Sequence, residues 1–76
     1  MKNNKQFAVI GLGRFGRAVV ETLVASGYDV MGCDKNMEAV KQMEHIATDV
    51  MQLDVMNEDA MQYIGLNNFD VVIVAI

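Results

Sequence analysis

One stretch of the sequence decides the fold: Phe7-Ala8-Val9-Ile10-Gly11-Leu12-Gly13-Arg14-Phe15-Gly16. An apolar, strand-like segment runs into a G-x-G-x-x-G sequence, and a helix-like segment follows from Ala18 to Val24. A lone G-x-G-x-x-G is a weak signal. It becomes typical of a dinucleotide-binding turn when it leaves a strand, opens a helix and is followed about 20 residues later by an acid. The acid here is Asp34, at the end of the next apolar segment.

The glycines of this stretch have separate mechanical roles. Gly11 permits the tight turn off the strand, Gly13 lets the backbone approach a pyrophosphate, and Gly16 lets the helix pack close to the strand. The helix then presents unpaired N–H groups and the positive end of its dipole to the phosphates. Asp34 can accept both hydroxyls of an adenosine ribose. We therefore predict that this turn and Asp34 hold the two halves of an ADP-like group.

The rest of the chain repeats the same alternation of strand and helix. Apolar runs predict strands at residues 6–11, 28–33, 48–53 and 70–76. Helical spacing predicts helices over about 13–26, after Asn36 and between Asn57 and Gly65. Right-handed crossovers turn this order into an α/β fold, a Rossmann-like open parallel sheet of strand order 3-2-1-4 with helices on both faces. Residues 1–76 are then the first mononucleotide-binding half of a domain plus its fourth strand.

Individual residues mark where the predicted helices begin, end and face the core. Gly27 is placed to end the first helix in a left-handed cap. Asn36 is placed to cap the second, with Glu38 in its first turn, where the helix dipole favours an acid. Four apolar residues of that second helix recur at helical spacing and are predicted to be core: Met37, Val40, Met43 and Ala47.

Composition excludes several classes of protein. Net charge is −4, with ten acids against six bases, so a basic face for nucleic acid is not expected and we predict no nucleic-acid partner. Apolar runs fall far short of the roughly 20 residues that span a bilayer, and the polar start is no signal peptide. Cys33 is the only cysteine, which fits a reduced, cytoplasmic protein. Any membrane connection would then come through a partner.

The sequence contains no pattern of residues that indicates a catalytic or a metal site. We find no nucleophile with a base and no His/Cys/Asp/Glu set at metal-ligand spacing, so no catalytic and no metal site is predicted. Asp49 and Asp54 are five apart on a strand and therefore face opposite ways. In this fold the nicotinamide lies over the second half of the sheet, so these residues hold an ADP-like group at most.

The last strand is expected to lie at an edge of the sheet. Residues 70–76 are apolar on both faces and lack the charges or proline that usually protect an edge. Such an edge is expected to pair with another copy of the chain. The alternative is that the natural protein continues beyond residue 76 and covers it.

With these motifs placed, the chain resembles the N-terminal nucleotide-binding part of RCK domains, also called KTN or TrkA-N domains. The resemblance is nearest to the regulatory subunit of bacterial Ktr-type potassium uptake systems and runs the length of the chain. Its most discriminating pieces are Arg14-Phe15 and Leu53-Asp54-Val55-Met56. In many family members the segment that corresponds to Leu53-Asp54-Val55-Met56 is Gly-Asp-Ala-Thr and lies near the adenine. Only Asp54 matches that sequence here.

The resemblance implies a cytoplasmic regulatory protein that is not an enzyme. Such proteins bind NAD(H), ATP or ADP, form dimers and then rings of eight, and gate a membrane potassium transporter, to which they are peripheral. Arg14 would point toward the phosphates, including those of a neighbouring subunit. The implied cofactor-binding residues are Gly11, Gly13, Arg14, Phe15, Gly16, Asp34, Lys35, Asp54 and Val55.

Two other functions remain open on the sequence. The chain could be the nucleotide-binding half of an NAD-dependent dehydrogenase, or a structural oligomerisation piece with a vestigial motif, because the fold serves many functions. Asp34 would repel a 2′-phosphate, which disfavours NADP, although Lys35 beside it could soften that repulsion. NAD(H), ATP and ADP share the ribose that Asp34 would hold, so the sequence does not rank them.

Overall fold

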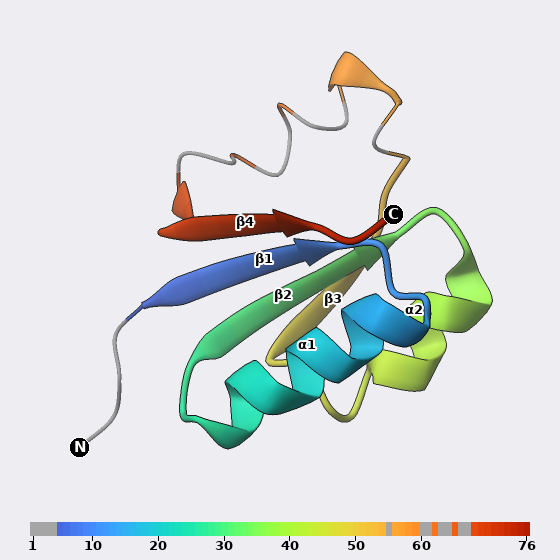
Figure 1. Ribbon diagram of the computed structural model, residues 1–76. Helices are drawn as coiled ribbons and strands as arrows, with labels where there is room; N and C mark the ends of the chain where they lie inside the picture. Colours follow the sequence, from blue (N-terminus) through green and yellow to red (C-terminus); the bar gives the residue numbers. More distant parts are fainter. Residues whose placement is uncertain (1–4, 55, 60–61, 63–64, 66–67) are drawn as a thin grey trace.

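Parallel strands form the framework of the protein. The computed structural model describes residues 5–54, 56–59, 62, 65 and 68–76. Within them the strands are β1 (Gln6–Ile10), β2 (Asp29–Asp34), β3 (Asp49–Gln52) and β4 (Val71–Val74). They pair in parallel in the order β3-β2-β1-β4 (Figure 1). The predicted α/β fold class and the strand order 3-2-1-4 are confirmed.

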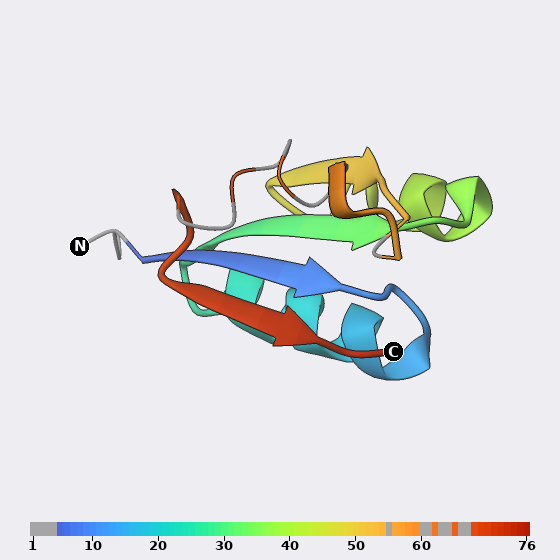
Figure 2. The same ribbon diagram turned by 90° about the horizontal axis from the view of Figure 1, so that it is seen from above.

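Two helices cover one face of this sheet. They are α1 (Arg14–Ala25), which follows the glycine turn, and α2 (Met37–Met43), which connects β2 to β3. Figure 2 shows the sheet from above, with α1 beneath it and, in the connection between β3 and β4, residues 56–59 over the other face. In that connection Glu58, Asp59 and Gln62 are helical. The rest of the helix predicted between Asn57 and Gly65 lies largely outside the described residues.

Both helix ends singled out in the sequence behave as predicted. Gly27 has a φ of 90° and its N–H donates to the Val24 carbonyl at 3.0 Å, while the Tyr28 N–H donates to the Leu23 carbonyl at 3.1 Å. This pair of bonds is a Schellman motif. Asn36 caps α2, its side chain accepting from the Glu38 N–H at 2.9 Å.

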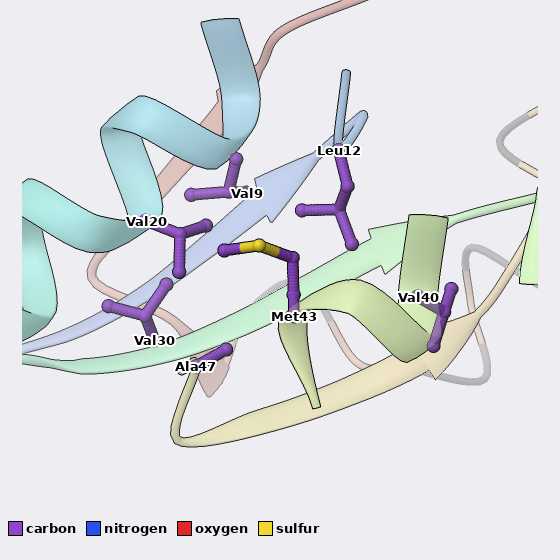
Figure 3. Close-up of a cluster of buried hydrophobic side chains, with 7 residues drawn as sticks. All are labelled: Val9, Leu12, Val20, Val30, Val40, Met43 and Ala47. Carbon is purple, nitrogen blue, oxygen red and sulfur yellow. The ribbon is translucent and has the colours of Figure 1, made fainter. Parts of the chain in front are cut away.

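The main core lies between the sheet and the two helices. Figure 3 shows its buried side chains, which are Val9, Leu12, Val20, Val30, Val40, Met43 and Ala47. Three of the four residues predicted as core on the second helix are among them, although Ala47 lies beyond the end of α2 at Met43. Met37, the first residue of α2, is the exception and is 42% exposed. A smaller cluster on the other face consists of Ile10, Cys33 and Leu53.

The register of the sheet fixes what meets at its carboxyl edge. Ile10 of β1 pairs with Cys33 of β2, so the next residues, Gly11 and Asp34, lie side by side at this edge. The predicted first strand reached Gly11 but β1 ends one residue earlier, because Gly11 turns away with a φ of 102°. In open parallel sheets ligands bind outside this edge. No helix in the described part of the chain is long and apolar enough to cross a membrane.

Candidate nucleotide-binding site

A cavity of about 330 Å³ opens at the carboxyl edge of the sheet. Its volume falls at the lower end of the range that small-molecule sites occupy. The cavity receives residues from the ends of all four described strands. Its lining is Ile10, Gly11, Gly13, Asp34, Lys35, Leu53, Asp54, Met56, Ala75 and Ile76.

The turn off β1 requires two of its glycines for steric reasons within the protein. A Cβ on Gly11, already at positive φ, would lie 2.8 Å from the Ala75 carbonyl oxygen at the end of β4. A Cβ on Gly16 would collide with the Gly11 carbonyl, where α1 crosses the turn. These are the tight turn and the close helix packing that the sequence predicts. Neither glycine needs a ligand to explain it.

Gly13 differs from the other two glycines. It is the N-cap residue of α1, with φ −71° and ψ −165°, which any residue adopts. Apart from its chain neighbours, no atom of the described residues lies within 4 Å of a Cβ added there. The part of the chain that the structure describes therefore gives no steric reason for glycine at this position. A ligand atom held close to the backbone would give one, as for the pyrophosphate-approaching glycine of this kind of turn.

The start of α1 is left open beside this glycine. No side chain in the described ranges caps the helix, and its first turn contains no acid. The first N–H groups of a helix have no partner within the helix and carry its positive dipole end. The site therefore combines orphan donors, positive potential and an unobstructed backbone, which are the features that bind phosphate groups.

Asp34 lines the same cavity from the end of β2. Its Oδ2 accepts from the Leu12 N–H at 2.7 Å and its Oδ1 accepts from the Asn36 N–H at 2.8 Å. An ionised carboxylate has about four acceptor positions on two oxygens. One position therefore remains on each oxygen, which is what a ribose with two adjacent hydroxyls requires.

The remaining wall is formed by the ends of β2 and β3. The Lys35 carbonyl accepts from the Gln52 side-chain amide at 3.1 Å, which ties the two strand ends together. Asp54 accepts from the Met56 N–H through Oδ1 at 2.9 Å and is itself exposed. With Leu53 beneath it, this wall offers an apolar surface and a carboxylate edge, suited to a flat base that carries an amino group.

The structure brings together five of the nine residues predicted to bind the cofactor. These are Gly11, Gly13, Asp34, Lys35 and Asp54, all of which line the cavity. Gly16 is buried behind the turn, and Val55 lies outside the described residues. Arg14 and Phe15 are exposed on the first turn of α1 and do not line the cavity, Phe15 being 67% exposed.

Sequence reasoning missed the apolar part of the lining. Ile10, Leu53, Met56, Ala75 and Ile76 all contribute to the cavity. Four of them lie at or just beyond the carboxyl end of a strand. The rule that places ligands at those ends would have found these four once the strand order was known.

The ionisable side chains that line the cavity, within the described part of the chain, are those of Asp34, Lys35 and Asp54. Burial, with a smaller contribution from the charge of Asp49, raises the pKa of the Cys33 thiol to about 11, so it stays protonated at neutral pH. No set of three or more His, Cys, Asp or Glu residues that could hold a metal occurs among the described residues. The arrangement suits holding a phosphorylated ligand.

A solved structure shares the fold. N5-carboxyaminoimidazole synthetase from Staphylococcus aureus, complexed with ADP, superposes with a TM-score of 0.78 and 22% sequence identity. The match covers 97% of this chain and 19% of that one. At this identity the likeness shows the fold alone.

Curated relatives match almost the whole chain. Ktr system potassium uptake protein A of Bacillus subtilis is 42% identical over 73 residues, and protein C of the same organism is 43% identical over 72. Protein A of Vibrio alginolyticus is 38% identical over 73 residues. These matches cover 95–96% of this chain but 33% of each relative, so the chain spans about a third of their length. The TrkA-N domain model matches residues 7–76, and the chain therefore belongs to the TrkA-N domain family, related to Ktr systems.

Proposed function

We propose that this domain binds an adenine nucleotide, NAD(H), ATP or ADP, and thereby regulates a membrane potassium transporter. The observation that carries the proposal is the cavity between the uncapped start of α1 and the carboxylate of Asp34. The start of α1 offers donors for phosphate, and the carboxylate of Asp34 offers acceptors for the ribose hydroxyls. The distance between them is set by the pairing of β1 with β2 and not by a flexible loop.

The phosphates are assigned to the start of α1. Gly13 leaves the backbone accessible, and the N–H groups that follow it supply hydrogen bonds without a competing side chain. Arg14 is exposed on the same turn and can reach a terminal phosphate from outside the cavity. A guanidinium there would distinguish ligands by their phosphate count.

The ribose and the base are assigned to the other side of the cavity. Asp34 accepts the two ribose hydroxyls in its remaining acceptor positions. The base lies against Leu53 and the exposed Asp54, whose second carboxylate oxygen can accept from an adenine amino group. NAD(H), ATP and ADP present these same groups, so all three fit this assignment.

Regulation of transport, without a reaction of its own, is proposed from the relatives. The three matched proteins are named as potassium uptake proteins of Ktr systems. We propose by analogy a cytoplasmic protein that is held at the membrane by a transporter subunit and assembles with copies of itself, as a dimer and a ring of eight. Ligands that favour different arrangements of such an assembly would shift the open fraction of the transporter.

Calorimetric titration tests the binding part. NADH, ATP, ADP and AMP are titrated into the natural protein at its full length and into the Asp34→Ala variant. Asp49→Ala serves as a control that removes a similar charge at the far end of the sheet. We expect Asp34→Ala to weaken each ligand about tenfold or more, from lost hydrogen bonds to a charged group. Absence of binding by all four nucleotides would contradict the proposal.

A second titration tests Arg14. Arg14→Ala is expected to weaken ATP more than AMP, because only ATP carries the γ-phosphate. An equal loss of affinity for ATP and AMP would show that Arg14 does not distinguish nucleotides by their number of phosphates.

Potassium uptake tests the regulatory part of the proposal. It is measured in cells that carry the transporter and this protein, either wild type or Asp34→Ala. If the rate of potassium uptake is the same with Asp34→Ala as with the wild type, although the variant no longer binds nucleotide, the regulatory role is contradicted.

The edge strand suggests how copies of this domain meet. β4 lies at the edge of the sheet, with Val71 36% and Val74 65% exposed. An unprotected apolar edge favours pairing. Light scattering of residues 1–76 at tens of micromolar is expected to give a mass above that of one chain. A mass equal to one chain would rule out pairing by this piece alone.

A further inference from the structure

Leu12 is the residue that attaches the glycine turn to β2. Its side chain is 1% exposed and lies in the main core (Figure 3). It packs on Gly32 of β2, where an added Cβ would come within 3.1 Å of Leu12 Cδ2. Removing a leucine from a packed core leaves a cavity that the surroundings fill only in part, so this side chain fixes one point of the turn firmly.

The backbone of the turn is attached to the same strand at two neighbouring points. The Gly11 N–H donates to the Cys33 carbonyl at 2.7 Å, and the Leu12 N–H donates to Asp34 Oδ2 at 2.7 Å. The other oxygen of Asp34 accepts from the Asn36 N–H, in the turn that leads to α2. A single carboxylate thus joins the turn before α1 to the turn before α2.

We propose that Asp34 is a positioning residue for the glycine turn as well as a ligand for ribose. Its hydrogen bond to the Leu12 N–H holds Gly13 and the start of α1 in place before any nucleotide arrives. The bond is charge-assisted and joins residues 22 apart in sequence. The ligand-binding part of this inference rests on the function proposed above, whereas the ligand-free part does not.

The two roles of Asp34 predict different behaviour toward ligands. A turn that is already ordered spares a ligand the entropic cost of ordering it, which raises affinity without any added contact. If Asp34 only contacted ribose, its removal would leave a nucleotide without ribose hydroxyls unaffected. If it positions the turn, that nucleotide also binds more weakly. 2′,3′-Dideoxy-ADP is such a ligand, since it keeps the phosphates and the base.

Titration with ADP and 2′,3′-dideoxy-ADP separates the roles. The natural full-length protein is compared with Asp34→Ala, Asp34→Asn and the control Asp49→Ala. We expect Asp34→Ala to weaken dideoxy-ADP about fivefold or more, the loss associated with one hydrogen bond. Asp34→Asn, which keeps one side-chain oxygen to accept from Leu12, is expected to recover part of that loss. Unchanged dideoxy-ADP affinity in Asp34→Ala, with ADP weakened, would overturn the positioning role.

Hydrogen exchange of the ligand-free protein gives an independent test. Fragmentation that isolates single amides is used to compare the exchange rate of the Leu12 amide with that of Gly13. Within the described residues the Gly13 N–H has no backbone acceptor. The Leu12 amide is expected to exchange at least about tenfold more slowly than Gly13 in the wild type, and faster in Asp34→Ala but not in Asp49→Ala. Equal rates for Leu12 and Gly13 in the wild type would overturn the proposal even if Asp34→Ala fails to fold. Protection of Leu12 without any ADP binding would instead count against the proposed function alone.

Discussion

Two helices begin at the same edge of the sheet and their first turns are built in opposite ways. α2 starts with Asn36, whose side chain accepts from the Glu38 N–H, and it carries that acid in its first turn. α1 starts with Gly13, which provides no cap, and its first turn has no acid. An N-cap Asn is more stabilising than an N-cap Gly by a few tenths of a kcal/mol, so α1 forgoes a small amount of stability that α2 has.

The difference between the two helix starts indicates which of them can bind an anion. A helix start that is saturated by its own side chain has no donors left for a ligand, while one that is left open does. The open helix start borders the cavity, whereas Asn36 does not line it. The two helix starts therefore allow local stability and ligand binding to be separated by mutation.

Gly16→Ala is expected to have the largest effect on stability, because it interferes with the close packing of α1 against the glycine turn. The new Cβ would collide with the Gly11 carbonyl, a backbone atom that has little freedom to move. We expect a loss of about 3 kcal/mol or more in the free energy of unfolding, at the upper end for overpacking. Denaturant titration measures it. Wild-type stability would mean that α1 sits farther from the turn.

Gly13→Asp would convert the open helix start into a capped one like that of α2. The carboxylate is expected to cap α1 and raise the free energy of unfolding by about 0.5–1 kcal/mol. It also places a negative charge where the phosphates bind, so nucleotide affinity is expected to fall about a hundredfold or more. Calorimetry and denaturant titration measure the two effects. Retained affinity would refute the phosphate assignment.

Gly13→Ala adds only a methyl group at the same place. Since the new Cβ has no described atom within 4 Å besides those of its chain neighbours, stability is expected to change by less than about 1 kcal/mol. Nucleotide affinity is expected to fall about tenfold, because the methyl group keeps phosphates away from the backbone. Comparison with Gly16→Ala is the control for general damage. Full affinity in Gly13→Ala would show that no ligand approaches this glycine.

Asn36→Ala should have the smallest effect, and on stability alone. Loss of the α2 cap is expected to cost about 1 kcal/mol in the free energy of unfolding. Nucleotide affinity is expected to stay near that of the wild type, because Asn36 contributes only its backbone N–H to Asp34. Thermal unfolding and titration of the same sample check both points. A large loss of affinity would place the α2 start in the binding site after all.

Local rules account for most of what the sequence predicted correctly. The glycine spacing, the apolar runs and the residues Gly27 and Asn36 each act within a few positions of the chain, so pattern reading finds them. Met37 shows the limit of such reading. Helical spacing assigns it to the core, but whether a first-turn residue is covered depends on elements elsewhere, and it is 42% exposed.

The sequence by itself determined that a glycine turn joins a buried strand to a helix and that an acid ends the next strand. Only the tertiary structure decided how these meet. The register Ile10 with Cys33 places Asp34 beside the turn, and its carboxylate then takes the Leu12 N–H from 22 residues away. In the same way, pairing of β4 with β1 brings Ala75 and Ile76 into the cavity. Strand pairing between distant residues carries this information, because no local pattern specifies which backbone donors a side chain will face.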